Sequence, residues 1–456
     1  MQARRLVLQG ATVLTGPDWR PLVSHDVLIE GDRIEAVAPQ GSFAYPESAR
    51  KVDCKGMFLL PGFIDMHTHC HTTAAVDFLS QFGPRMEERS HREWFLKLFL
   101  AYGVTTVRDV GNFQEIFDLK REFMGNPGAP AMFVAGELME GAELMWPLGR
   151  RVVDSRAARE EVKRQKELGA DWVKLYAGLE PDVASTAIKE AHSLGLRVAG
   201  HIGKTTARQA AKMNIDTLEH TLTLVDEGFL NEEDRTSLPT ATDARSRRLR
   251  LRETWAKADL DSDAAKDLVN SLLKSMTAVC PTLVVHENIM TGPDKSYQNF
   301  AYDYVPQQWL DTWEGRFKVF NPPGETLPDP HEALQKALDL IRRLRSAGVR
   351  ILGGTDAALW NPYAVPGASL HREMELHVAA RSSPEDALSS VTCLAADTLG
   401  VGDDVGTLEK GKLADLVLLR RNPLEDVRNT REIELVINKG HAFTPEDILE
   451  EPEPIG

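Results

Sequence analysis

The sequence predicts an α/β protein, a (β/α)8 barrel with β-rich segments at both ends of the chain. Its 456 residues are too many for one small core and suit a large barrel plus a smaller domain. The first and the last ~55 residues alternate apolar and polar side chains, as half-buried strands do. Between these ends, short apolar runs alternate with helical periods, which is typical of βα units around a parallel sheet.

Five segments at the ends of the chain are predicted to form strands or hairpins. Each combines strand-type alternation with turn residues such as Gly, Asp or Pro. They are residues 5–15, 26–39 and 51–62 near the start, and 404–423 and 433–443 near the end.

Residues 170–221 show the alternation of strand and helix in detail. The run "ADWVKLYAG" is strand-like, and the helical segment after it has Pro181 near its start and Gly195 as its stop. "LRVAGHIG" follows as a strand, "KTTARQAAKMN" as a helix with Asn214 as a left-handed cap, and "IDTLEHT" as the next strand. Three strands and two crossover helices within about 50 residues is the spacing expected of a (β/α) barrel.

Extending this pattern in both directions gives eight candidate barrel strands. They are residues 61–69, 103–110, 131–138, 171–177, 196–202, 215–221, 278–286 and 349–357. Two stretches, 225–277 and 287–335, are longer than a βα loop requires. We interpret both as insertions near the mouth of an active site, where they could serve as a lid.

Composition excludes several classes of partner and points to one compartment. The net charge of −15 argues against nucleic acid and against an anionic membrane surface, because both are bound through basic patches. Four scattered cysteines without C-x-x-C spacing suit a reducing compartment. No apolar run has the length of a signal-peptide core or of a membrane span. We therefore expect a cytoplasmic protein with a small-molecule substrate, and a homo-oligomer is compatible with an acidic barrel of this size.

The stretch "LPGFIDMHTHCH" places His67, His69 and His71 at every second position. Residues two apart on a strand point to the same side, so His67 and His69 can direct two imidazoles at one metal ion. A surface strand that merely carries histidines would look the same, and the other ligands must come from elsewhere in the chain.

Polar side chains also stand toward the C-terminal ends of other predicted strands, where barrel active sites lie. Imidazole and carboxylate suit zinc, and also manganese, cobalt or iron. The candidate metal ligands are His67, His69, Lys174, His201, His220 and Asp356.

Four motifs of the chain resemble those of the amidohydrolase superfamily, in its imidazolonepropionase-like and Xaa-Pro dipeptidase-like branch. They are "LPGFIDMHTH", "GVTTVRDVG", "GTDA" and the C-terminal "VGTLEKGKLADLVLLRRNPLEDV". The resemblance implies a metal-dependent hydrolase with a TIM barrel over residues 61–402. It also implies that residues 1–60 and 403–456 together form a small β-sandwich.

The resemblance further implies a binuclear centre. His67 and His69 are expected to hold the more buried metal, and His201 and His220 the more exposed one. Lys174 would carry a CO2-derived carbamate that bridges the two. A metal-bridging hydroxide would attack the substrate, since a divalent metal lowers the pKa of water to ~7. Asp356 would bind the buried metal and shuttle the proton to the leaving group.

Four further side chains are candidates for substrate contacts, and Tyr176 is also a candidate catalytic residue. They are Tyr176, His286 on the predicted seventh strand, Arg108 and His71. Tyr176 lies two residues beyond Lys174 and so faces the same way, toward a substrate carbonyl oxygen. Arg108 would meet either an anionic substrate group or a structural ion pair. Cys70 and His371 are expected to be structural.

Several reactions fit this ligand set. The first is hydrolysis of the amide bond of an N-acyl amino acid, a dipeptide or a cyclic amide. "HIGK" and "KLYAGLEP" depart from the aromatic residue and the Gly-Gly that dipeptide-cleaving members usually show. Lactone or ester hydrolysis at the same site remains open, as does a mononuclear cyclic-amide hydrolase or deaminase. Against a deaminase, Lys204 and Thr223 stand where a proton-shuttling glutamate would follow His201 and His220. A barrel with only a binding role should have lost part of the ligand set, and all six positions are filled.

Overall fold

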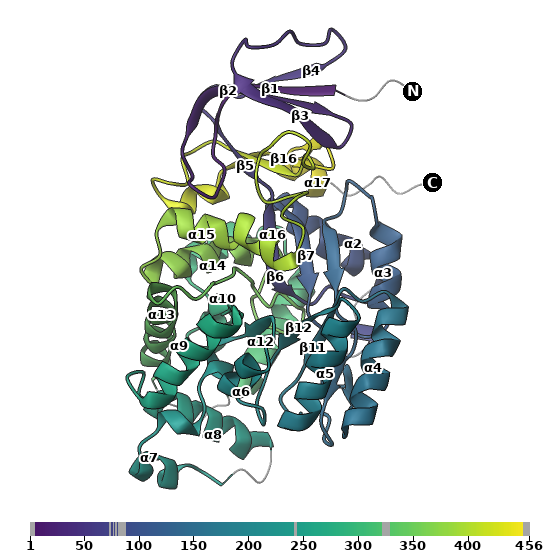
Figure 1. The fold of residues 1–456 in the computed structure, drawn as a ribbon. Coiled ribbons are helices and arrows are strands. Elements are labelled where there is room, and N and C mark those ends of the chain that lie inside the picture. The colour runs from purple at the N-terminus through teal and green to yellow at the C-terminus, as the bar shows by residue number, and fades with distance from the viewer. Residues whose placement is uncertain are drawn as a thin grey trace.

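The protein is a mixed α/β structure in which strands from both ends of the chain form one sheet and the central part forms parallel sheets (Figure 1). This computed structural model describes residues 5–72, 74–75, 77, 80, 88–240, 244–321 and 329–449. No helix within these ranges is both long enough and apolar enough to cross a bilayer.

One eight-stranded sheet joins the two ends of the chain. Its order is β17-β16-β15-β5-β1-β2-β3, with β4 paired to β1. These strands are β1 Arg5–Val13, β2 Leu22–Glu30, β3 Arg33–Pro39, β4 Arg50–Asp53, β5 Phe58–Pro61, β15 Leu416–Leu419, β16 Ile433–Asn438 and β17 His441–Phe443. Strand β5 pairs with β1 on one side and antiparallel to β15 on the other, so the N- and C-terminal segments depend on each other. Leu8, Leu59 and Leu418 are fully buried in the core that they share.

The central strands pair in parallel in two sheets. The three-stranded sheet contains β6 Phe63–Thr68, β7 Val104–Asp109 and β8 Ala131–Val134. The six-stranded sheet contains β9 Leu138–Glu140, β10 Gly149–Arg151, β11 Trp172–Leu175, β12 Arg197–Gly200, β13 Thr217–Glu219 and β14 Ala278–Cys280. Isolated parallel bridges link Ala135 to Trp172, Val279 to Ile351 and Thr68 to Ala357. Segment 351–357 therefore connects β14 back to β6.

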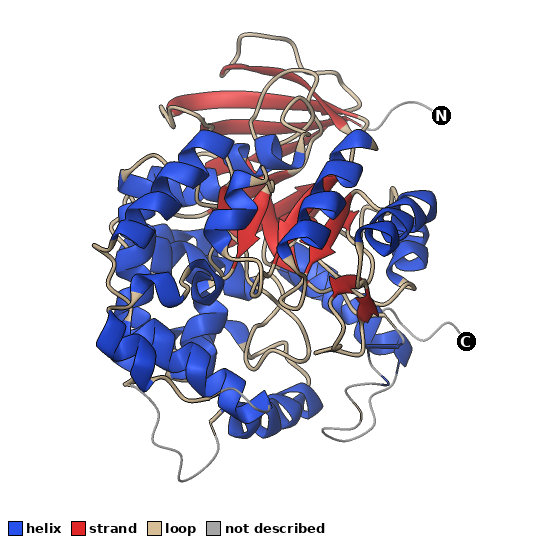
Figure 2. Cartoon of the chain, turned by 60° about the horizontal axis from the view of Figure 1, so that its bottom comes forward, coloured by secondary structure: helices blue, strands red, loops and turns tan. Residues whose placement is uncertain are grey.

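Helices surround the parallel strands, and the eight-stranded sheet covers one end of them (Figure 2). The α-helices are α2 Glu88–Ala101, α3 Ile116–Phe123, α4 Ser155–Leu168, α5 Pro181–Ser193, α6 Ala207–Lys212, α7 Glu232–Ser237, α8 Ala244–Lys257, α9 Asp263–Ser275, α10 Leu283–Met290, α11 Lys295–Ala301, α12 Gln307–Phe320, α13 Pro330–Ser346, α14 Ala368–Ala379, α15 Pro384–Ser390, α16 Cys393–Leu399 and α17 Pro445–Leu449. Short 3-10 turns are η1 Thr221–Leu224, η2 Glu227–Phe229 and η3 Val427–Arg431.

The ends of helices α5 and α6 agree with the sequence pattern. Pro181 occupies the first turn of α5, and Gly195 follows that helix in the left-handed region with φ of 68°. Helix α6 starts with a capping box between Thr206 and Gln209. Asn214 follows it with φ of 63°, as predicted for a left-handed cap.

Three predicted strands are wrong in extent. The predicted strand 278–286 stops at Cys280 because Pro281 and Thr282 break it, and α10 starts at Leu283. The predicted strand 349–357 forms only isolated bridges at its two ends, and its centre contains two glycines. The predicted strand 131–138 is divided, with β8 ending at Val134 and β9 starting at Leu138.

The two predicted insertions are largely helical and packed. Stretch 225–277 contains η2, α7, α8 and α9, and stretch 287–335 contains α11 and α12. Trp309 and Trp313 of α12 are completely buried in the main core. Residues 241–243 and 322–328, which belong to these stretches, lie outside the described residues.

Candidate metal centre

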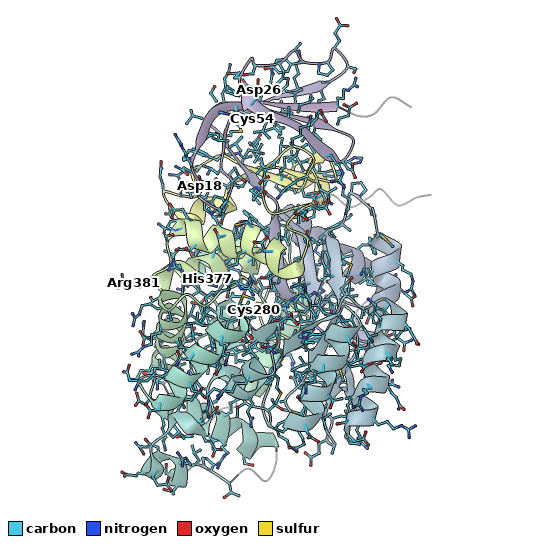
Figure 3. The ribbon with its side chains drawn as sticks, viewed as in Figure 1. Asp18, Asp26, Cys54, Cys280, His377 and Arg381 are labelled. Atoms are coloured by element: carbon cyan, nitrogen blue, oxygen red, sulfur yellow. The ribbon has the colours of Figure 1, made fainter. Side chains whose placement is uncertain are left out.

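A cavity of about 260 Å³ lies where the parallel strands end. All six side chains predicted to bind metal line it, and so do Tyr176 and His286. The six are His67, His69, Lys174, His201, His220 and Asp356. Cys280 of β14 lies inside the larger part of the molecule, away from Asp26 and Cys54 in the end sheet (Figure 3). The four cysteines of the chain are free.

Asp356 is the centre of the histidine cluster. One of its carboxylate oxygens lies 3.1 Å from His69 Nε2 and 3.4 Å from His67 Nε2. The other oxygen lies 3.8 Å from His220 Nδ1. The His201 and His220 ring centroids are 4.7 Å apart. Ligand atoms of His67, His220 and Asp356 all lie within 4.8 Å of one another, close enough to share one cation.

Lys174 contributes an unusual buried amine. Its side chain is almost fully buried, and its Nζ has no hydrogen-bond partner among the described residues. Burial lowers the pKa of Lys174 to about 8, because a low-dielectric site disfavours the ammonium. A buried amine with a depressed pKa is more readily neutral, and a neutral amine is the form that reacts with CO2.

A buried ionic layer below the cavity orients His67. His67 Nδ1 donates to Glu219 Oε2 at 2.6 Å, which leaves Nε2 directed toward Asp356. The other oxygen of Glu219 accepts from Arg108 Nη2 at 2.9 Å and from Thr217 Oγ1 at 2.5 Å. Burial raises the pKa of Glu219, but Arg108, Lys174 and His67 outweigh it and hold that pKa well below its usual value. Glu219 therefore stays anionic and fixes which nitrogen of His67 faces the cavity.

The structure places two of the candidate substrate contacts away from the cavity. Arg108 takes the structural role: it is completely buried, donates to the Met66 carbonyl and Glu219, and stacks over Trp172. His71 accepts from the backbone N–H of Leu359 at 2.7 Å and does not line the cavity. Arg108 lies within β7, and His71 lies three residues beyond the end of β6.

Cys70 and His371, for which we expect a structural role, lie in the interior of the protein. Both are fully buried. The Cys70 backbone N–H donates to Asp109 at 2.6 Å, and His371 Nδ1 lies 2.9 Å from Thr430 Oγ1. Neither side chain lines the cavity.

Tyr176 and His286 do line the cavity, although His286 lies on helix α10 and not on the predicted strand. The Tyr176 hydroxyl accepts from Trp146 Nε1 at 2.7 Å, and its ring lies 4.4 Å from the His201 ring, centroid to centroid. Burial raises the pKa of Tyr176, so the hydroxyl keeps its proton and can donate it to a substrate oxygen.

Three non-glycine residues around the cavity have left-handed backbones. They are His220 with φ of 65°, Thr282 with φ of 49° and Asp356 with φ of 53°. His220 Nδ1 lies 2.8 Å from Thr282 Oγ1, so the two strained residues support each other. Such conformations cost free energy and cluster at functional sites. Gly354 is also required, because a Cβ there would lie 2.4 Å from Cys280 Sγ and 2.8 Å from His67 Cβ.

Several residues around the cavity were missed by the sequence patterns. Glu219 could have been found, because Thr217 and Glu219 are polar residues two apart, on the same face of a short buried strand. Thr282, Trp146 and Arg252 carry no such signal, since each is placed by a loop or by a helix of the insertion.

Comparison with known proteins agrees with this arrangement. Residues 58–249 and 299–442, well over half of the chain, match the model of the amidohydrolase family. An imidazolonepropionase from Aromatoleum aromaticum is 49% identical over 77 residues, which are 17% of this chain and 18% of that protein. The match to that curated relative therefore spans under a fifth of its length.

Solved structures match over nearly the whole chain. A prolidase complexed with N-methylphosphonate-L-proline has a TM-score of 0.70 at 21% identity, covering 96% of this chain and 99% of that one. A Xaa-Pro dipeptidase with bound methionine has a TM-score of 0.68 at 18% identity over 96% and 99%. At these identities the likeness shows a common fold.

Proposed function

The chain belongs to the amidohydrolase family, and from that premise we propose that it is a metal-dependent hydrolase that cleaves an amide C–N bond of a small molecule. The observation that carries the proposal is the convergence of six side chains on one cavity. They come from segments that are distant in sequence. His67 Nε2, for example, lies 3.4 Å from a carboxylate oxygen of Asp356.

We propose the matching architecture as well. Residues 61–402 would form a (β/α)8 TIM barrel, and residues 1–60 with 403–456 a composite β-sandwich. The parallel pairings and the bridges at 351–357 support the barrel. The pairing of β5 with β15 supports the composite domain.

The side chains around the cavity fit a pair of divalent ions, most readily zinc. Four imidazoles, a carboxylate and a lysine without a hydrogen-bond partner among the described residues form a donor set of the right kind. His67, His69 and Asp356 would hold one ion, and His201 and His220 the other, with Lys174 as a carbamate between them. When bound, the metals would activate a water molecule and polarise the scissile carbonyl.

The residues of the chain would then divide the remaining work. Asp356 would accept a proton from the attacking water and pass it to the leaving nitrogen, because its carboxylate is the acidic group at the centre of the cluster. Tyr176 would donate a hydrogen bond to the substrate oxygen as charge develops there. Trp146 and Trp360 would keep bulk water away from the reacting atoms.

The test is a combined metal analysis and activity screen. The protein is loaded with zinc, cobalt or manganese, and bound metal is counted by mass spectrometry. Activity is then measured on N-acyl amino acids, dipeptides, cyclic amides, lactones and esters. We expect about two ions per chain and turnover of at least one amide, with Asp356→Asn inactive. Turnover of lactones or esters alone would replace the amidase assignment with an esterase, and full activity of Asp356→Asn would remove the proton shuttle.

A further inference from the structure

A buried carboxylate on helix α14 has no part in the proposed reaction. Helix α14 packs beside α10, and its Glu373 is completely buried without lining the cavity (Figure 1). Glu373 Oε1 accepts from the backbone N–H of Leu283 at 3.0 Å, and Oε2 accepts from that of Val284 at 2.8 Å. His377 Nε2 lies 3.3 Å from Oε1. Because burying a carboxylate is costly, the two backbone donors at the start of α10 account for where Glu373 lies.

The first turn of α10 is capped by a residue of another helix. Thr282 occupies the N-cap position of α10, where a threonine side chain ordinarily accepts from the backbone of the first turn. Here the Thr282 side chain makes no such bond, and Glu373 accepts from the first turn instead. The threonine hydroxyl lies 2.8 Å from His220 Nδ1. Glu373 therefore takes the part of the cap, and Thr282 contacts a candidate metal ligand.

The turn that carries Thr282 is tied to the segment that carries His220. The His220 N–H donates to the Cys280 carbonyl at 2.9 Å, two residues before Thr282. His220 and Thr282 both have left-handed backbones, with φ of 65° and 49°. This conformation is costly for a β-branched residue such as threonine, so it persists only where the surrounding contacts hold it. Glu373 supplies such contacts on the side of α10.

The contact with Thr282 decides which nitrogen of His220 is available to a metal. Nδ1 is within hydrogen-bond distance of Thr282 Oγ1 at 2.8 Å, whereas the Asp356 oxygen at 3.8 Å is too far for a hydrogen bond. Histidines that bind a metal commonly donate their other ring N–H to a neighbouring oxygen. With the ring proton on Nδ1 and donated to Thr282, His220 Nε2 keeps its lone pair for a metal ion.

We propose that Thr282 and Glu373 are positioning residues for His220. Glu373 caps α10 in place of Thr282, and the hydroxyl that this leaves available fixes the direction and the tautomer of the His220 imidazole. The proposal goes beyond the proposed function, and only its effect on metal affinity rests on that function.

The first test observes His220 without added metal. The full chain is prepared with isotopically labelled histidine for nitrogen NMR, and the His220 signals are assigned by their loss in His220→Gln. We expect the Nδ1–H tautomer to predominate in the unsubstituted protein and in Thr282→Ser, which keeps the hydroxyl. Thr282→Val keeps the shape and loses the hydroxyl, so the population of the Nε2–H tautomer should increase several-fold. An unchanged tautomer in Thr282→Val would overturn the proposal.

The second test measures metal affinity by competition with a chelator. Thr282→Val should weaken one of the two bound ions by about 10- to 100-fold, and Thr282→Ser should restore most of that affinity. Glu373→Gln has one carbonyl oxygen for two backbone N–H groups, so it should weaken the same ion by about 10-fold. Because both residues act through one imidazole, the double variant should lose less than the product of the two single losses.

Asp329→Asn is the matched control, since Asp329 caps another helix, α13, by accepting from the backbone N–H of His331 at 2.8 Å. It should lower thermal stability and leave both metal affinities unchanged. Equal weakening of both ions in Glu373→Gln, or a loss of stability without a change in affinity, would make Glu373 a structural residue only. If Glu373→Gln does not fold, the comparison of Thr282→Val with Thr282→Ser decides the proposal.

The two tests separate this proposal from the proposed function. If no amide is hydrolysed and the His220 tautomer changes in Thr282→Val, the positioning role stands and the amide-hydrolase assignment fails. If amides are hydrolysed and Thr282→Val changes neither the tautomer nor the metal affinity, the hydrolase stands and the positioning role fails.

Discussion

The two ends of the cavity are built in different ways. The metal-ligand end is formed by residues at the ends of parallel strands, and Glu219 and Arg108 fix it from below through fully buried contacts. Another part of the cavity wall, which includes Arg252 and His286, comes from helices α8 and α10. Contacts with other helices hold these two helices in place. The two parts of the cavity wall therefore come from different kinds of element, strand ends on one side and packed helices on the other.

The largest effect is expected from a substitution at Asp356. It would remove the proposed proton acceptor from the part of the cavity that the strand ends form. Asp356→Asn keeps the size of the side chain and removes its charge. We expect kcat to fall by about 10³-fold or more, since the proposed general base would also be a metal ligand. Steady-state kinetics with parallel metal analysis measures this. Asp339→Asn on α13, which pairs with Arg342 at the surface, is the control and should be unaffected.

A second large effect is expected from pH acting on Lys174. Carbamate formation needs the neutral amine, and burial lowers the pKa of Lys174 to about 8. The neutral fraction therefore rises by about fifty-fold between pH 6 and pH 8 and levels off above pH 8. Recovery of metal-stripped protein with metal and dissolved CO2 at constant concentration should follow this curve. A recovery rate that does not change with pH would mean that Lys174 is not carboxylated.

A substitution at Glu219 tests whether the buried contacts with His67 and Arg108 position the metal-binding side chains. Glu219→Gln keeps the shape but removes the charge that holds His67 in its tautomer and balances Arg108. We expect metal affinity to fall by about 10- to 100-fold, as for other residues that orient a ligand. Competition with a chelator gives the affinity directly. Glu227→Gln on η2 serves as the control, and an unchanged affinity in Glu219→Gln would show that packing alone orients His67.

The smallest effect is expected from a substitution at Lys336, which donates to the backbone at the end of helix α8. Lys336→Met removes the donors to the carbonyls at the end of α8. Stability should fall by about 1 kcal/mol, and KM should rise a few-fold with kcat unchanged, because α8 carries Arg252 but none of the ligands. Thermal unfolding and kinetics together measure this. A fall in kcat instead of a rise in KM would show that the two ends of the cavity are coupled.

The sequence patterns identified the cavity residues at the strand ends far better than those on helices α8 and α10. His67, His69, Lys174, His201 and His220 stand out because strand alternation and strand ends are local patterns. Helix α8 has no such signal: its charged sequence shows no clear apolar face, and tertiary contacts of Trp255 position it. His286 was assigned to a strand because a short apolar run fits a strand or a helix equally well, and Pro281 decides between them.

The eight-stranded sheet has a consequence for how the protein is made. Strand β5 ends at residue 61 and pairs with β15, which starts at residue 416. At ~5–20 residues per second, roughly 20–70 s of translation separate the two strands. Throughout that interval one edge of the nascent N-terminal sheet stays open to pairing with neighbouring chains, so slowed synthesis of the C-terminal segment should raise aggregation on the ribosome.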